Sequence, residues 1–118
     1  MSDATTQTPL RPVELLVLLV LVDGPLHGYG LVQRIEEETD GSVRLVPGNL
    51  YPVLRRLEEH AWIAESEKRP AADLDDARRR YYRVTDQGLT VLRSEVERME
   101  RLVRSARHRR LLRTKEQR

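Results

Sequence analysis

Residues 47–59 (PGNLYPVLRRLEE) divide into two chemically different sets at helical spacing. The apolar set falls on one face of a helix and consists of Leu50, Val53, Leu54 and Leu57. The polar set occupies the sides and the opposite face and consists of Asn49, Tyr51, Arg55 and Arg56. A helix that packs with one face and presents Asn, Tyr and Arg on the other suits recognition in a DNA major groove. From this stretch alone, an ordinary amphipathic surface helix is the alternative.

Two further helices are predicted before this one. Pro12 suits a helix start because its missing N–H is not needed there. Residues 13–22 are apolar except for Glu14 and contain five Leu, which indicates a buried helix, with a buried strand as the alternative. A second amphipathic helix is expected over residues 28–39, followed by a short extended connector at 42–46. Three helices in this arrangement are typical of a helix-turn-helix domain.

A β-hairpin is expected after the third helix. Residues 62–68 alternate weakly, and residues 79–84 form a good strand with Tyr82 and Val84 on one face. A loop over 69–78 joins them. A two-stranded hairpin is marginal alone and must pack against helices. Directly after a recognition helix it predicts a wing, so the fold class is mainly α with a small β-hairpin: a winged helix-turn-helix.

The last helix is predicted to begin after Thr85, a natural N-cap, and to mediate dimerisation. Its apolar residues recur with spacings of 3, 4, 3, 4 and 3, which is a heptad seam: Leu89, Leu92, Val96, Met99, Val103 and Ala106. Three residues of the first helix are assigned to the same interface: Leu15, Leu16 and Leu19. A long, strict seam favours pairing with a second copy, and packing back onto its own domain is the alternative.

Composition and charge place these elements in one small domain. The 118 residues include no Cys, so disulfides and thiolate metal sites are excluded, and the apolar fraction of 39% favours burial against a second copy. The net charge of +2 is uneven, because residues 101–118 hold eight Lys or Arg against one Glu. We expect a disordered segment at 1–9, a DNA-binding domain at 10–84, the dimerisation helix at 85–107 and a basic frayed tail at 108–118. No signal peptide or membrane span is evident, which favours a cytoplasmic protein.

Three blocks of the sequence resemble the PadR family of bacterial transcriptional regulators, over roughly residues 10–105. Residues 24–30 (GPLHGYG) are similar to the family's "GPLHGYE" junction between its first two helices. Residues 47–59 are close to "sPGTLYPALRRLEE", and residues 80–88 (RYYRVTDQG) are close to "RKYYRLTeeG". The small size resembles the family's short branch, with a single C-terminal dimerisation helix.

The resemblance and the residue chemistry together give a predicted DNA-binding set: Gly48, Asn49, Tyr51, Pro52, Arg55, Arg56, Arg78, Arg79 and Arg80. Contact at Tyr51 is implied by the resemblance, whereas its residue type also suits core packing. Asn49 stands where many members have Thr, and Asn can bond adenine bidentately. Tyr29 is expected to be a packing residue.

Two positions depart from the family pattern. Ala61 replaces the usual Gly, so the turn after the third helix is expected to differ slightly. The hairpin tip carries three acidic residues, Asp73, Asp75 and Asp76, where wings that touch DNA are usually basic. Contact between this tip and DNA is therefore left open.

The predicted function is a dimeric, sequence-specific DNA-binding transcriptional regulator. Its partners would be a palindromic double-stranded operator, a second copy and a small-molecule effector, and repression relieved by such a molecule or another signal is the expected mode. No nucleophile–base set, phosphate loop or metal spacing is present, which excludes an enzyme, and no cofactor or metal is expected. The alternative is a winged-helix module that regulates a partner protein. Trp62 is assigned to the core instead of to a ligand platform.

Overall fold

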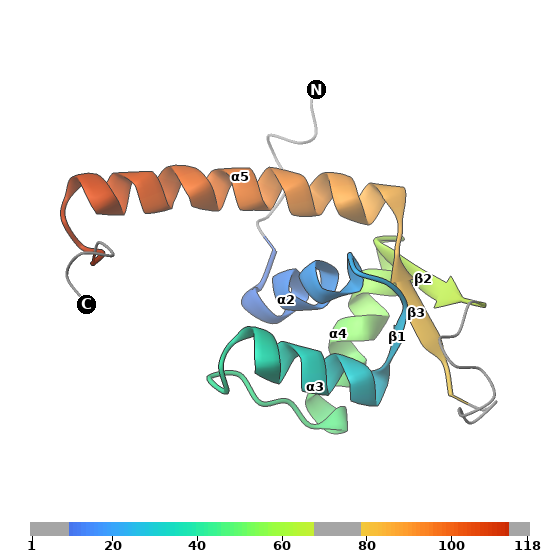
Figure 1. Cartoon of the computed structure of the whole chain (residues 1–118). Coiled ribbons are helices and arrows are strands. Elements are labelled where there is room, and N and C mark those ends of the chain that lie inside the picture. Colours follow the sequence, from blue (N-terminus) through green and yellow to red (C-terminus); the bar gives the residue numbers. More distant parts are fainter. Residues whose placement is uncertain (1–9, 68–78, 114–118) are drawn as a thin grey trace.

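The computed structural model describes residues 10–67 and 79–113. The predictions for residues 1–9, for Arg78 and the wing tip, and for the end of the tail fall outside these ranges. Four helices and three short strands make up the described chain, and the last helix lies across the others (Figure 1). In chain order the elements are α2 (Pro12–Leu21), β1 (Leu26–His27), α3 (Gly28–Glu38), α4 (Pro47–Glu59), β2 (Ile63–Ser66), β3 (Tyr81–Val84) and α5 (Asp86–His108).

The central element is α2, which contacts α3, α4, α5 and β3. Its apolar run is a helix, as predicted, and the strand alternative is wrong. Val17, Leu18 and Leu21 are fully buried in the core. Glu14, the one charged residue in the run, is also buried, so the run packs against neighbours on nearly every side. Burial of each apolar side chain, Val17, Leu18 or Leu21, stabilises the fold by about 1.5–3 kcal/mol.

The predicted amphipathic helix at 47–59 is α4, with the bounds that the sequence indicated. Leu50, Leu54 and Leu57 are buried in the core, and Val53 packs at its edge. Pro52 lies inside the helix and lacks the N–H that would bond the Gly48 carbonyl. The apolar face of α4 therefore holds the helix to the domain and leaves the polar face outward.

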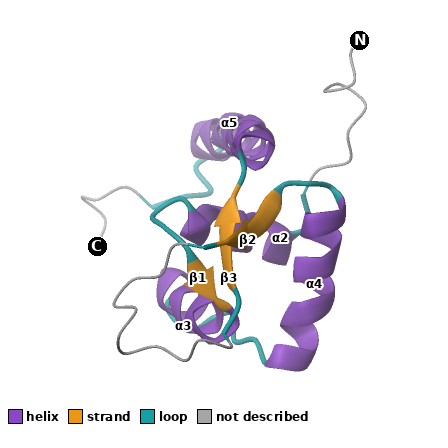
Figure 2. Cartoon of the chain, turned by 90° about the vertical axis from the view of Figure 1, so that its right-hand side faces the viewer, coloured by secondary structure: helices purple, strands orange, loops and turns teal. Residues whose placement is uncertain are grey.

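The predicted hairpin is present as β2 paired antiparallel with β3, with Glu65 opposite Tyr82 and Ser66 opposite Tyr81. A third strand, β1, was not predicted and pairs antiparallel with the other edge of β3, giving the order β1-β3-β2. Figure 2 shows the strands between α3 and α4. The small sheet thus connects the start of α3 to the wing.

The last helix, α5, has 23 residues and is about 34 Å long. Thr85 caps it as predicted, with its Oγ accepting the Gly88 N–H at 3.0 Å. The part of α5 nearest Thr85 packs on α2 and β3, and the rest extends beyond the domain (Figure 1). The helix ends at His108, one residue from the predicted end. Within the described residues, no helix combines the length and the apolar character needed to cross a bilayer.

Candidate nucleic-acid interface

The outward face of α4 carries the residues that the sequence assigned to DNA contact. Gly48, Asn49, Pro52 and Arg55 are all exposed. Tyr51 is 54% exposed, so its side chain is not a core residue. Arg55 forms no ion pair with any residue in the described ranges. The first three turns of α4 therefore present an amide, a phenol and a guanidinium to solvent.

The structure places Arg56 differently from Arg55. Its Nε donates to Oε2 of Glu14 on α2 at 2.7 Å, so the side chain turns toward the domain. Burial alone would raise the pKa of Glu14, but the Arg11 backbone N–H and the Arg56 guanidinium outweigh burial and lower that pKa. Arg56 thus joins α4 to α2, a role that the sequence analysis did not assign to it.

Arg79 and Arg80 are exposed and lie directly before β3. Arg80 Nη2 lies 3.5 Å from Glu58 Oε2 and 3.4 Å from Glu65 Oε1, and its guanidinium carbon is 5.5 Å from the centroid of the Tyr82 ring. Burial is the main cause that raises the pKa of Tyr82. Arg80 is therefore held by its own domain on two sides.

A hollow of about 520 Å³ adjoins α4 where these arginines meet the start of α3. We refer to it as the tyrosine hollow; the side chains that line it are His27, Tyr29, Tyr51, Arg79, Arg80 and Tyr82. The structure thus brings together three residues of the predicted set with residues of α3 and β1 that were not assigned to it.

Tyr29, expected to be a packing residue, does not belong to the core, because its side chain is 63% exposed. Its ring stacks on His27 with a centroid distance of 6.4 Å. His27 has a local role, since its Nδ1 accepts the Gly30 N–H at 3.0 Å and caps α3. Its position directly before the glycine that starts α3 could have indicated this cap.

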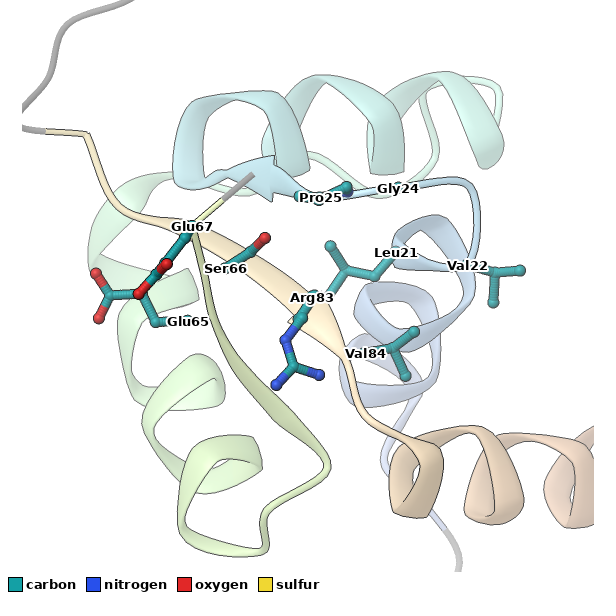
Figure 3. A pocket seen from close by; sticks show the side chains of 9 residues that line it. All are labelled: Leu21, Val22, Gly24, Pro25, Glu65, Ser66, Glu67, Arg83 and Val84. Atoms are coloured by element: carbon teal, nitrogen blue, oxygen red, sulfur yellow. The ribbon is translucent and has the colours of Figure 1, made fainter. Parts of the chain in front are cut away.

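A second hollow, of about 570 Å³, lies between the end of α2 and the strands β2 and β3. Figure 3 shows Leu21 and Val84 on one side, the carboxylates of Glu65 and Glu67 on the other, and Arg83 between them. Arg83 forms no ion pair within the described part of the chain. The lining of this hollow is partly apolar, and none of the predicted DNA-binding residues belongs to it.

The residues assigned to a dimer interface are not equivalent in the structure. Leu92 is 4% exposed and belongs to the core of its own chain, and the three leucines of α2, Leu15, Leu16 and Leu19, are partly buried against that core. Leu89 and Ala106 are half-buried. Val96, Met99 and Val103 are exposed by 44%, 39% and 42%, beside the exposed Leu102. Of the residues assigned to the interface, those that remain exposed thus lie on α5 from Val96 onward.

The chain is similar to proteins of a known family. Residues 17–94 match the profile of the transcriptional regulator PadR-like family. A transcriptional regulator of Mycobacterium tuberculosis is 35% identical over 92 residues, which cover 78% of this chain and 79% of that protein. An uncharacterised 37.1 kDa transposon protein of Streptomyces fradiae is 37% identical over 89 residues, or 75% of this chain and 23% of that protein.

Solved structures agree with the family match. A PadR-family transcriptional regulator from Eggerthella lenta is similar with a TM-score of 0.59 and 32% identity, over 86% of this chain and 83% of that one. Bacillus subtilis PadR in complex with operator DNA shares the fold, with a TM-score of 0.60 and 22% identity over 73% of this chain and 47% of that one. The structure is a winged helix with an exposed polar face on α4. The family match over residues 17–94 and the similarity to these relatives show that the chain belongs to the PadR-like family of transcriptional regulators, which are not enzymes.

Proposed function

We propose that this protein regulates transcription by binding double-stranded DNA with α4 in the major groove. The observation that carries the proposal is the division of α4: Leu50, Leu54 and Leu57 fasten it to the core, while Asn49, Tyr51 and Arg55 face solvent. Amide and guanidinium groups can bond base edges in pairs, and cations can contact phosphates. The fold shared with a PadR bound to operator DNA supports this assignment.

The binding species in this proposal is a homodimer. The exposed apolar residues on the second half of α5, Val96, Met99, Leu102 and Val103, would be covered by the same helix of a second copy. Two copies related by a two-fold axis would place two α4 helices in successive major grooves. The operator would accordingly be palindromic.

We further propose that the dimer acts as a repressor that a signal releases from DNA. A dimer seated over a promoter excludes other proteins from the same grooves. The hollow around Arg83 offers a small-molecule signal a place on the winged-helix domain, between α2 and the wing strands.

Selection of tight binders from random duplex DNA tests the function. An enriched palindrome with half-sites about one helical turn apart is the expected result. Affinity for that operator should fall steeply with salt, because Lys and Arg contacts to phosphates release counterions. A selection that enriches no sequence, together with weak binding at low salt, would favour the alternative of a module that regulates a partner protein.

Two substitutions on α4 separate reading of bases from contact with phosphate. Asn49→Ala should weaken operator binding by roughly 1–3 kcal/mol and relax the base preference at one position of each half-site. Arg55→Ala should weaken operator and random DNA about equally and make the salt dependence shallower. Both are read by fluorescence anisotropy at several salt concentrations. Wild-type affinity for both DNAs in both variants would exclude α4 as the reader.

A further inference from the structure

The tyrosine hollow has a lining that suits an anion. Three phenols, two guanidiniums and an imidazole line it, and no carboxylate of the described residues does. Glu58 and Glu65 contact Arg80 but are not part of the lining. Arg79 Nη1 lies 3.0 Å from His27 Nε2, so the second cation is positioned by the residue that caps α3. The lining therefore combines hydrogen-bond donors with positively charged groups.

Two hydroxyl groups at the mouth of the tyrosine hollow are available to a ligand. Tyr29 and Tyr51 are 63% and 54% exposed, and neither hydroxyl bonds to another residue in the described ranges. The two rings come from different helices, α3 and α4, and line one hollow. The Tyr29 ring stacks on the His27 ring with an interplanar angle of 9°. An exposed tyrosine whose hydroxyl has no bond within the described ranges suits a contact with a polar partner.

The tyrosine hollow lies beside the first turns of α4, and this position favours a DNA phosphate as the anion. Tyr51 stands on the first turns of α4, two residues after Asn49, and also lines the hollow. A duplex whose major groove holds α4 must bring its sugar–phosphate backbone alongside these turns. Most contacts that fix the register of a protein on DNA are made to such phosphates.

We propose that the tyrosine hollow seats one phosphate of the DNA backbone in each half-site. The donors are the hydroxyls of Tyr29 and Tyr51 and the guanidinium of Arg79. Tyr29 is then a residue that sets the register of α4 in the groove without reading a base. This inference rests on the proposed function, because the phosphate belongs to the duplex that α4 enters.

The test uses the full-length protein and the duplex obtained by selection, with Tyr29→Phe as the variant. This change removes one hydroxyl and keeps the ring that stacks on His27, and circular dichroism confirms that the fold is retained. Affinity should fall about tenfold on the operator and by the same factor on random duplex DNA, since the contact carries no sequence information. Arg79→Gln should also weaken both DNAs and should reduce the magnitude of the salt slope by about 0.9 per protomer. Arg93→Gln, an exposed cation on α5, is the matched control and should leave the slope unchanged.

Replacing single phosphates of the operator by uncharged methylphosphonates locates the seat. One position in each half-site should weaken the wild-type complex, and the same position should have a much smaller effect on Tyr29→Phe. Wild-type binding with no change in Tyr29→Phe would overturn the seat and leave the proposed function standing. Equal sensitivity of the variant and the wild type at every phosphate would also overturn it. Failure of the wild type to bind any duplex would overturn the proposed function and the seat together.

Discussion

Ala61 closes α4 in a backbone conformation that a side chain makes unfavourable. Its φ is +61°, in the left-handed region, and it is followed by the bond from the Trp62 N–H to the Leu57 carbonyl at 3.0 Å. The Ala61 N–H also donates to the Glu58 carbonyl. These two hydrogen bonds form a Schellman motif, which usually has Gly at the left-handed position. The turn therefore keeps the left-handed geometry although the residue differs from the family pattern.

Replacing Ala61 by Gly should stabilise the protein by about 0.5–1 kcal/mol. The gain is the left-handed strain that is relieved, less the extra backbone entropy that Gly loses on folding. Urea unfolding at a fixed protein concentration measures it as a higher midpoint. Ala64→Gly is the control, because Ala64 lies in β2 without a positive φ and should lose stability. A lower midpoint for Ala61→Gly would mean that the turn is not strained.

Gly88 allows the start of α5 to lie directly against the turn after α4. A Cβ added there would stand 2.1 Å from the Trp62 carbonyl oxygen, a backbone atom that also accepts the Thr85 N–H. Gly88→Ala should therefore destabilise the fold by about 1–3 kcal/mol, despite the better helix propensity of Ala. Gly48→Ala, which meets nothing within 4 Å, should leave stability unchanged or raise it by up to about 1 kcal/mol. Thermal and urea unfolding of the two variants should thus move in different directions.

At the scale of elements, the pattern of apolar residues predicted each of the four helices and the wing hairpin, but it missed β1. Leu26 and His27 form a strand only because β3 pairs with them, and two residues are too short to show an alternating period. The heptad seam of α5 was also ambiguous. A heptad seam indicates that one face of a helix is buried, but it does not distinguish burial against the same domain, as at Leu92, from burial against a second copy.

The exposed half of α5 supports a specific test of dimerisation. Lysines in place of Val96 and Met99 should produce monomers in sedimentation experiments, because they would bury unpaired charges between the two helices. Neither residue belongs to the core of its own chain, so the monomer should stay folded. Ser94→Lys with Glu97→Lys has the same spacing on exposed positions of α5 and is the matched control, expected to remain dimeric. A wild-type protein that is monomeric at micromolar concentration would contradict the proposed dimer.

At the scale of the whole molecule, two buried carboxylates join elements that are far apart in the sequence. Glu14 links α2 to Arg56 of α4, and Glu95 of α5 accepts the Leu10 N–H at 2.7 Å. These contacts span 42 and 85 residues, and periodicity within one helix cannot reveal them. A lone charge in a buried helix, as at Glu14, does indicate that a partner must exist. The same limit applies to the tyrosine hollow, whose lining comes from four separate elements and their flanks.

Both carboxylates make stability sensitive to acid. The side-chain bond from Arg98 is the main cause that lowers the pKa of Glu95, opposed by burial and helped by the Leu10 N–H. The pKa of Glu14 is also lowered, although burial opposes it. A carboxyl group whose pKa is lower in the folded chain than in the unfolded chain stabilises the fold above the unfolded pKa, near 4.5. That contribution is lost as the pH falls further, through the folded pKa.

The contribution of these two carboxylates to the free energy of unfolding should therefore be nearly constant from about pH 7 to pH 5 and should fall steadily below that range. Glu14→Gln should lower stability at pH 7 by about 1.5–3 kcal/mol, because a buried, charged hydrogen bond to Arg56 is weakened. In the same variant the loss of stability between pH 5 and pH 3 should be smaller than in the wild type, since one of the two carboxylates with a lowered pKa no longer takes up a proton. Glu97→Gln, at an exposed position of α5, should keep the wild-type pH profile. Urea unfolding at each pH, at a single protein concentration, gives the comparison. If the free energy of unfolding changed with pH in the same way in the wild type and in Glu14→Gln, the contact between α2 and α4 would not be the source of the acid sensitivity.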